Sequence, residues 1–171
     1  IADSIVYDMK DSTLTFFKDP VLWHDINQLR GDTVRIYTKN KKVDRISCRT
    51  RSFMIGQDTV LNFNQIKGKN ITGYFKEDKL HRLEVNYNAE AIYYALQGDT
   101  ITSGINSVNS ESLIARFQNK KLNTITFYKE PKGKFIPFHE IKDENTRLKG
   151  FKWRFEEKPT IENITGRYYS R

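Results

Sequence analysis

Cysteine, histidine and proline are scarce: the 171 residues include one cysteine, three histidines and four prolines. The lone Cys48 excludes an internal disulfide and any site built from several cysteines. His24, His81 and His139 are far apart, and none has metal-ligand spacing to another histidine, cysteine or aspartate. No nucleophile elbow, phosphate-binding loop or zinc-protease motif occurs either. We therefore expect a non-enzymatic protein with no catalytic residues, no metal and no cofactor.

Long apolar runs are also missing. No stretch approaches the roughly 18 apolar residues that a membrane-spanning helix needs, and the start has no signal-peptide pattern. The opening, "IADSIVYDMKDS", lacks an initial methionine and enters a strand-like alternation almost at once. We expect the chain to be a piece of a longer protein.

The composition is that of one folded domain, with 37% hydrophobic, 13% aromatic and 29% charged residues. The formal net charge is +8, which attracts polyanions such as nucleic acid, anionic lipid headgroups and phosphorylated saccharides. Many of the lysines occupy predicted turns, where solvation alone accounts for them. The charge therefore limits the class of partner without choosing one.

The most informative feature is a repeated hairpin. "NQLRGDTVRIYTKNKKVDRISC" at 27–48 recurs 37 residues later as "NQIKGKNITGYFKEDKLHRLEV" at 64–85. This offset matches Gln28 with Gln65, Gly31 with Gly68, Val34 with Ile71, Tyr37 with Tyr74, Val43 with Leu80, Ile46 with Leu83 and Cys48 with Val85. A weaker third copy lies 42 residues further on and contains Leu113, Phe117, Leu122, Ile125 and Phe127. Periods of this length predict stacked supersecondary units that share one apolar core.

Each unit has a β pattern. "TVRIYT", "RLEVNY" and "TITFY" alternate with period two and are rich in β-branched and aromatic residues. Outside the repeated hairpins, we expect strands at 4–8, 13–17, 21–24, 53–56, 59–63, 91–96, 100–103, 134–138 and 150–155. No segment convincingly predicts a helix.

Alternation gives every predicted strand one apolar and one polar face. The apolar set is Val34, Ile36, Ile46, Ile71, Phe75, Leu83, Val85, Leu113, Phe117, Ile125 and Phe127. The residues between them include Arg35, Arg45, Arg82 and Arg116. The pattern predicts a sandwich or a folded-over sheet with a continuous apolar interior, and it does not separate a packed core from a ligand-binding surface. Cys48 shares the apolar face, which favours a small buried residue over a nucleophile.

Two binding alternatives follow from the residues alone. The tyrosines and basic charge are compatible with stacking on single-stranded nucleic acid, although no RNA-recognition signature is present. A carbohydrate-binding surface using Trp23 or Trp153 is the other, although both tryptophans lie in apolar strand-like stretches. A purely structural repeat that only assembles with its neighbours is a third possibility.

The order of these motifs resembles the OstA/LptA-type periplasmic domain, and in particular the OstA-like proteins of Bacteroidetes. The most specific stretch is "DPVLWHDINQLRGDTVRIYTKNKKVDRI", with an Asp-Pro turn, a tryptophan strand and the Gly-Asp hairpin. "LKGFKWRFEEKP" at 148–159 resembles the segment with which such chains leave the repeats. The resemblance covers most of 1–160, which we take as one domain, and 161–171 as a C-terminal tail.

This resemblance implies an open β-jellyroll, a sheet folded into a V, located in the periplasm or associated with the outer membrane. Its apolar trough, formed by the eleven residues above, is implied to hold the acyl chains of lipopolysaccharide or a related amphiphile. Edge strands would join the domain to other transport-bridge proteins or to itself, and no nucleic acid is expected. We expect the headgroup to meet a rim of Lys39, Lys41, Lys42, Lys79, Lys120 and Lys121. The segment 129–150 breaks the repeat, and we expect the trough to close or be capped there.

Overall fold

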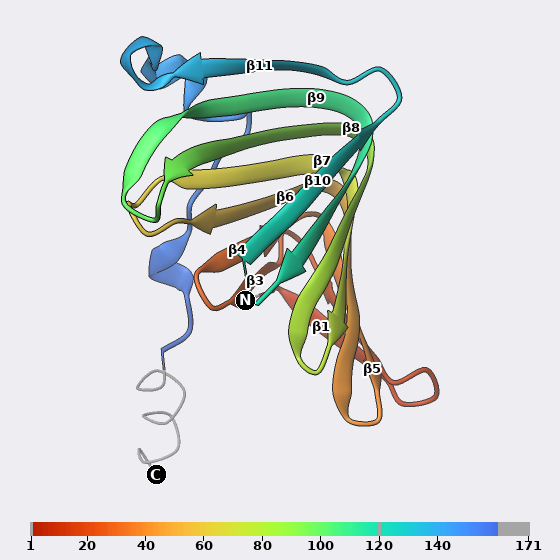
Figure 1. Ribbon diagram of the computed structural model, residues 1–171. Helices are drawn as coiled ribbons and strands as arrows, with labels where there is room; N and C mark the ends of the chain where they lie inside the picture. The colour runs from red at the N-terminus through yellow and green to blue at the C-terminus, as the bar shows by residue number, and fades with distance from the viewer. Residues whose placement is uncertain (1, 120, 161–171) are drawn as a thin grey trace.

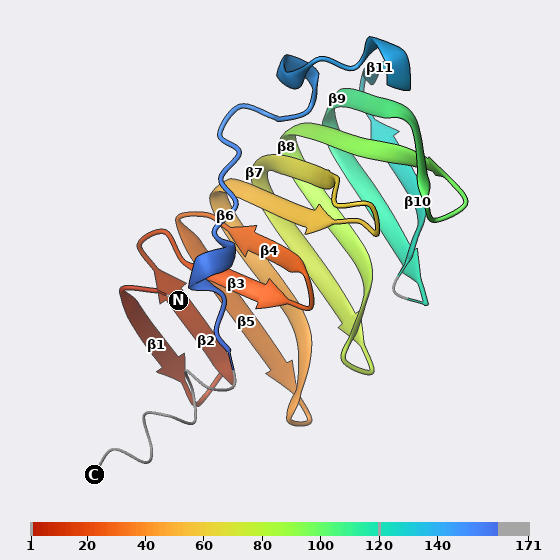
Figure 2. The same cartoon turned by 90° about the vertical axis from the view of Figure 1, so that its left-hand side faces the viewer.

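The computed structural model describes residues 2–119 and 121–160, so the expected tail at 161–171 lies outside the described residues. The described chain forms one 11-stranded antiparallel sheet (Figures 1 and 2). Its strands are β1 (Ser4–Asp8), β2 (Thr13–Phe17), β3 (Val21–His24), β4 (Asn27–Arg30), β5 (Thr33–Lys39), β6 (Lys42–Gln57), β7 (Phe63–Lys76), β8 (Lys79–Gln97), β9 (Ile101–Gln118), β10 (Lys121–Tyr128) and β11 (Lys132–Pro137). The prediction of an all-β fold is confirmed.

The sheet is folded into a V with two walls (Figure 1). The first wall contains strand residues within 4–17, 33–49, 70–86 and 112–128, and the second contains those within 21–30, 52–67, 89–110 and 132–137. The four long strands β6 to β9 run through both walls, whereas the sequence patterns predicted separate short strands on either side of the bend. The walls remain open to each other along the side opposite the bend (Figure 1).

Register shifts produce the bend. Pairing between β6 and β7 is interrupted at Thr50 and Arg51, whose φ angles are 60° and 53°. Pairing between β8 and β9 is interrupted at Tyr87 and Asn88, with φ angles of 66° and 55°. Bulges of this kind kink a strand and increase its twist, so each long strand turns from one wall into the other at the same level of the sheet.

The two glycines matched by the repeat lie at this bend. A Cβ atom on Gly31 would lie 2.4 Å from Cys48 Sγ, and one on Gly68 would lie 2.4 Å from Val85 Cγ1. Cys48 and Val85 are themselves matched residues of the repeat. Both copies therefore place a buried side chain against bare backbone, which only glycine permits.

The repeated turns lie together at the free end of the first wall. Asn40 and Lys41 join β5 to β6, and Glu77 and Asp78 join β7 to β8. All four have positive φ between 52° and 62°, as two-residue hairpin turns with the twist of the flanking strands require. Asn119, with a φ of 51°, opens the corresponding turn of the third copy. Three stacked hairpins are thus confirmed.

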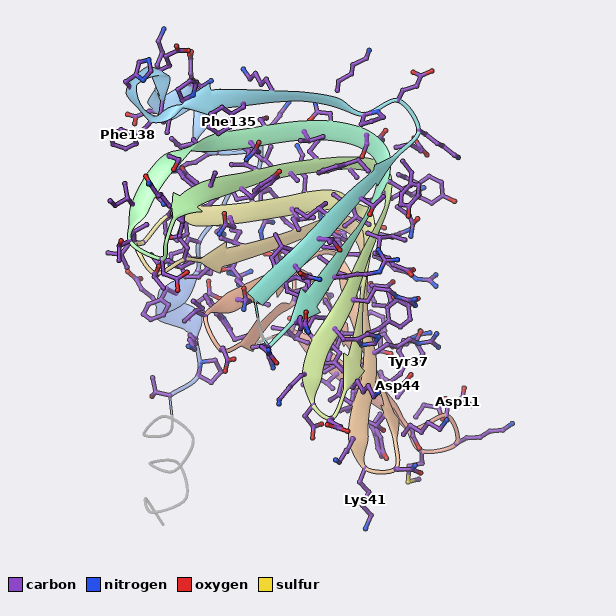
Figure 3. All side chains as sticks on the ribbon, in the orientation of Figure 1. Asp11, Tyr37, Lys41, Asp44, Phe135 and Phe138 are labelled. Carbon is purple, nitrogen blue, oxygen red and sulfur yellow. The ribbon has the colours of Figure 1, made fainter. Side chains whose placement is uncertain are left out.

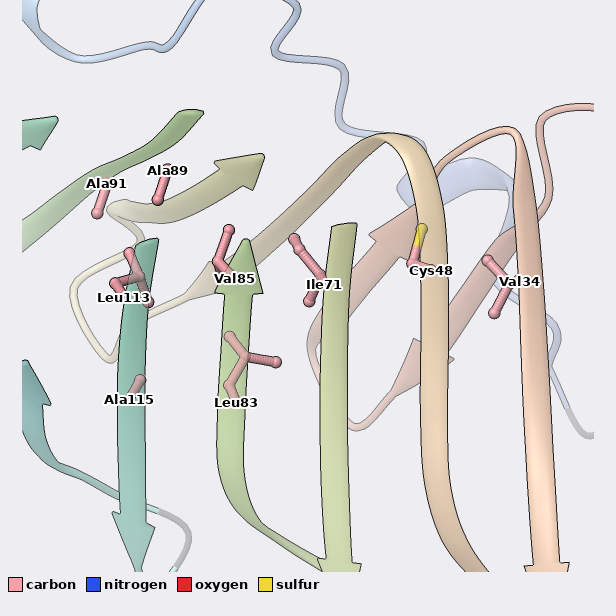
Figure 4. Close-up of a cluster of buried hydrophobic side chains, with 9 residues drawn as sticks. All are labelled: Val34, Cys48, Ile71, Leu83, Val85, Ala89, Ala91, Leu113 and Ala115. Carbon is pink, nitrogen blue, oxygen red and sulfur yellow. The ribbon is translucent and has the colours of Figure 1, made fainter. Parts of the chain in front are cut away.

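Two apolar clusters hold the fold together. One fills the space between the walls and contains nine buried side chains from both walls (Figure 4): Val34, Cys48, Ile71, Leu83, Val85, Ala89, Ala91, Leu113 and Ala115. The other lies on the outer face of the second wall and contains Phe53, Ile55, Ile92, Ile105, Ile136 and Leu148. Leu148 belongs to the segment 141–158 that follows β11, so this segment, named the strap here, covers that outer face.

The strap has no strand, which makes the predicted strand at 150–155 wrong. Its regular structure consists of the 3-10 turns η2 (Asp143–Asn145) and η3 (Phe155–Glu157), and η1 (Phe138–Glu140) precedes it. The strap crosses the strands instead of pairing with them, because its backbone is bonded to side chains. Gln65 Nε2 donates to Thr146 O at 2.7 Å and Gln65 Oε1 accepts from Leu148 N at 2.8 Å.

Gln28, the repeat partner of Gln65, makes the same pair of bonds six residues further along the strap. Its Nε2 donates to Lys152 O at 2.8 Å, and its Oε1 accepts from Arg154 N at 2.7 Å. Both glutamines are fully buried. The repeat thus preserves two side-chain clamps for one irregular segment.

A second predicted strand, at 59–63, is also wrong over most of its length. Residues 58–62 form a loop in which the Asp58 carboxylate accepts the backbone N–H groups of Val60 and Asn62 at 3.0 and 2.9 Å. This local bonding replaces strand pairing, as is usual for aspartate in turns. In the part of the chain that the structure describes, none of the helical turns is long and apolar enough to cross a membrane.

Candidate functional site

The inner face of the first wall is organised in rows that run across the strands. The row nearest the bend consists of Phe16, Val34, Cys48, Ile71, Val85, Leu113 and Phe127, each opposite the next. Five of these side chains, from Val34 to Leu113, are fully buried (Figure 4). This row is therefore a closed floor between the walls.

The next row is less tightly filled. It consists of Leu14, Ile36, Ile46, Gly73, Leu83, Ala115 and Ile125. Beyond it, toward the hairpin turns, the inner face carries Val43, Phe75 and Leu80, and Phe75 lies opposite Leu80. Gly73, the smallest residue of the middle row, borders the space above the closed floor.

A groove of about 370 Å³ occupies this space between the walls. The first wall lines it with Ile36, Ile46 and Leu83, and the β3–β4 hairpin and β6 of the second wall line it with Leu22, Leu29 and Met54. Its surface is mainly apolar, and its size lies within the range of natural ligand sites. The arrangement can hold an extended apolar group without a specific polar anchor.

Polar side chains are found at the mouth of the groove. His24 and Asn27 contribute from the β3–β4 hairpin, and Asp78 contributes from the β7–β8 turn. The His24 ring meets the Phe75 ring edge-on, with centroids 5.8 Å apart, so the two walls touch at this point. A ligand entering beside this contact would pass from a polar rim into an aliphatic interior.

All eleven predicted apolar residues lie on the inner face. Four of them line the groove: Ile36, Ile46, Phe75 and Leu83. Val34, Ile71, Val85 and Leu113 are fully buried in the floor, and Phe117, Ile125 and Phe127 pack against the same cluster. The predicted trough therefore has an open part beneath the β3–β4 hairpin and a filled part elsewhere.

The contribution of the second wall to the groove was not predicted from the sequence. Leu22, Leu29 and Met54 were absent from the predicted set, although Leu22 and Leu29 lie opposite each other in the β3–β4 hairpin. A signal was present in the strand that contains Trp23, before the Gly-Asp hairpin. Apolar residues in a predicted strand indicate a face that packs against an interior. Gly73 was also missed, because a glycine contributes no apolar side chain to a pattern.

The predicted lysine rim is only partly described. Lys39, Lys41, Lys42 and Lys79 are exposed at the free end of the first wall, and Lys41 points away from its tip (Figure 3). Lys120 lies outside the described residues, and Lys121 is placed only as the first residue of β10. The four described lysines belong to the hairpin ends nearest the groove mouth, and Lys79 follows the mouth residue Asp78.

The outer face of the first wall carries arginines stacked on tyrosines. The Arg45 guanidinium lies 4.1 Å from the Tyr37 ring centre, and that of Arg82 lies 4.2 Å from the Tyr74 ring centre. Tyr37 faces Arg45 and Tyr74 faces Arg82 across adjacent strands, so both contacts are cross-strand cation–π pairs. These rings are covered by guanidinium groups, which disfavours them as stacking platforms for nucleic acid bases.

Trp23 and Trp153 belong to the interface between strap and sheet. Their rings meet edge-on with centroids 5.0 Å apart, and Trp153 also packs against Phe63 at 5.1 Å. Both side chains are half-buried. This packing gives both tryptophans a role in attaching the strap.

Cys48 is a buried floor residue. Its thiol lies 3.2 Å from the carbonyl oxygen of Arg30, and burial raises its pKa to about 12. A thiol that keeps its proton and has no access to solvent is a poor nucleophile. Within the described ranges, no three histidine, cysteine or acidic side chains are grouped so as to hold a metal ion.

Comparison with known proteins gives a structural match only. No protein-family model matches the chain, and no curated protein matches its sequence significantly. The fold is similar to the crystal structure of LptH, the LptA-homologous periplasmic component of the conserved lipopolysaccharide transport device from Pseudomonas aeruginosa. The TM-score is 0.60 at 14% sequence identity, over 80% of this chain and 91% of that one. At this identity the match establishes architecture, and the chain has the LptA-like open β-jellyroll fold.

Proposed function

We propose that this chain is a non-enzymatic periplasmic module of the OstA-like type that carries lipopolysaccharide toward the outer membrane. The observation that supports this most directly is the apolar groove between the two walls of an LptA-like fold. The module would hold acyl chains against Ile36, Ile46 and Leu83 while the headgroup stays outside the mouth.

The energetics of the groove suit a carrier. Each methylene group removed from water contributes ~0.8 kcal/mol, and this contribution depends on area and not on direction. A groove of aliphatic side chains can therefore retain an acyl chain while allowing it to slide. His24, Asn27 and Asp78 lie at the mouth, where a hydrated headgroup would sit, and the amide of Gln28, the buried polar residue of the lining, is bonded to the strap.

The exposed lysines at the hairpin ends are proposed to meet that headgroup. Lys39, Lys41, Lys42 and Lys79 are exposed to solvent, so each would act as a point charge toward phosphate or acidic sugar and not as a fixed ligand. Their attraction to the headgroup would weaken with salt.

The edges of the sheet are proposed to join the module to other bridge proteins or to a second copy. β1 pairs only with β2, which leaves its other edge without a strand among the described residues. Ile5, Val6 and Tyr7 on this strand are all more than half exposed. An uncovered edge strand with apolar side chains is a ready site for strand addition.

Site-specific photo-crosslinking in cells tests the proposal. A benzophenone-bearing residue is placed at Ile46, which lines the groove, or at Arg45, the next residue, which is exposed on the outer face. We expect a lipopolysaccharide adduct from position 46 and none from position 45. Both variants must first show the native far-UV circular dichroism spectrum and a cooperative melt.

Adducts at neither position in folded protein would rule out lipid transport by this groove. An adduct from position 45 alone would place the ligand on the arginine-rich outer face. In that case, binding of oligonucleotides and anionic glycans to Arg35, Arg45 and Arg116 becomes the test of the alternative function.

A further inference from the structure

A glycine occupies the centre of the groove wall. Gly73 lies between Ile46 and Leu83 in the middle row of the first wall and is one of the residues that line the groove. Both of its cross-strand neighbours are aliphatic and point to the inside. Gly73 is therefore the point in this part of the row where the lining has no side chain.

Backbone conformation does not explain this glycine. Gly98 and Gly150 have positive φ, but Gly73 does not, so an ordinary residue can adopt its backbone conformation. A Cβ atom at Gly73 would meet Leu80 Cδ1 at 3.1 Å, Phe75 Cε2 at 3.5 Å and Leu83 Cδ1 at 3.7 Å. These are the ends of side chains, which can move by a few tenths of an ångström. The missing side chain therefore gives room to three side chains that line the groove, Leu80, Phe75 and Leu83, and is not required by the backbone conformation.

The repeat shows what the position holds elsewhere. Its counterpart in the first copy is Ile36, and its counterpart in the third copy is Ala115. All three lie in the same inner row. The second copy alone has no side chain here, and the groove, which the first and second copies line together beneath the β3–β4 hairpin, includes this position.

The floor beneath Gly73 is closed. Cys48, Ile71 and Val85 are fully buried in the row nearest the bend, so an apolar group cannot pass deeper between the walls. A chain that enters beside His24 and Phe75 therefore ends at, or turns along, the middle row. The distance from the mouth to this row limits how much of the chain can be buried.

We propose that Gly73 forms an alkyl-chain subsite and sets the size of chain that the groove accepts. This inference rests on the proposed function and makes it more specific. The ligand is a saturated acyl chain of an amphiphile, whose terminal part occupies the volume over the bare backbone of Gly73, bordered by Leu80, Phe75 and Leu83. A longer side chain at position 73 would occupy the same volume and displace the chain toward the mouth.

Binding of a fluorescent fatty acid to the purified chain, and its displacement by saturated fatty acids of increasing length, tests this subsite. Gly73→Ile introduces the residue of the first copy, and Gly73→Ala adds one methyl group. The matched control is Thr72→Ile, which adds similar apolar bulk at the neighbouring residue. Thr72 lies on the outer face of the first wall, between Ser47 and Glu84 on the adjacent strands.

We expect Gly73→Ile to weaken binding of the long-chain probe about tenfold, the equivalent of losing roughly two buried methylene groups. Gly73→Ala should shift the preferred displacing acid to a shorter chain, and Thr72→Ile should leave both readouts unchanged. If Gly73→Ile fails to fold, the chain-length preference of Gly73→Ala alone decides.

The outcomes separate the two proposals. If the natural chain does not bind the probe, the proposed function fails and the subsite fails with it. If the natural chain binds and the Gly73 variants keep its affinity and its chain-length preference, the groove function stands and the subsite is refuted.

Discussion

Replacing Gln65 with methionine should loosen the strap and destabilise the whole domain. Gln65 is fully buried, and its amide bonds Thr146 O at 2.7 Å and Leu148 N at 2.8 Å. Methionine has a similar length and fills the same space, but it offers neither the N–H donor nor the strong acceptor. The substitution therefore leaves a strap N–H and a strap C=O without their partners.

The expected loss follows from those two groups. Each buried polar group that loses its partner costs about 1–3 kcal/mol, and the Leu148 amide is inside the second cluster. Thr146 is only half-buried, so water can reach its carbonyl in part. We expect Gln65→Met to lower the free energy of unfolding by about 2–4 kcal/mol.

Urea unfolding followed by tryptophan fluorescence measures this change, because Trp153 lies on the strap and meets Trp23 at 5.0 Å. The midpoint should fall with little change in slope. Limited trypsin digestion gives a second readout, since Arg147, Lys149 and Lys152 lie on the strap and should be cut earlier.

Gln97→Met serves as the control, since Gln97 is exposed at the end of β8 and such changes usually alter stability by less than about 0.5 kcal/mol. The reasoning is refuted if Gln65→Met matches this control in both stability and digestion rate. Such a result would mean that the apolar contacts of the strap suffice without the clamp.

Three further predictions follow from the bend, the floor and the outer face. Gly31→Ala should destabilise the domain by about 1–3 kcal/mol in urea unfolding, because its Cβ would lie 2.4 Å from Cys48 Sγ. Gly68→Ala should cost a similar amount, because its Cβ would lie 2.4 Å from Val85 Cγ1. Cys48 should resist thiol reagents in the native state and react only on unfolding. Because folding raises the pKa of this thiol from 9.0 to about 12, the thiol ionises first in the unfolded chain, and thermal stability should fall as the pH rises through this interval. A double-mutant cycle on Tyr74 and Arg82 should give a coupling of about 0.5–1 kcal/mol; no coupling would show that their 4.2 Å contact adds nothing to stability.

The sequence determined the strands and their facing in the repeated hairpins. Val34 and Ile36, or Leu83 and Val85, alternate with polar residues, and period-two alternation requires one wall face to be apolar whatever the fold. The hairpin turns, with their positive-φ residues, set the pairing next to them, and a bulge at Asp44 and at the matched His81 then shifts the register before the inner rows. Local chemistry was sufficient for the strands and their facing.

The strap shows where local chemistry was insufficient. Residues 150–155 alternate like a strand, but Gln28 and Gln65 bond the strap backbone from the sheet face, so Phe151 and Trp153 pack down onto the second wall instead of entering a ladder. The two copies of the repeat match Gln28 with Gln65, but the strap residues that these glutamines bond lie more than 80 residues away in the chain. Only the folded sheet brings them together.

The groove itself was decided by tertiary structure. Alternation places Ile46 and Leu83 inside, but whether an inner face is packed or open depends on what the opposite wall presents to it. The bend at Thr50 and Arg51 brings Met54 and the β3–β4 hairpin over Gly73. The volume left there depends on how closely the side chains of the two walls pack against each other. A sequence determines which residues face the interior, because facing is set by neighbours along the strand. It does not by itself determine the space between them, because that space depends on contacts between distant segments.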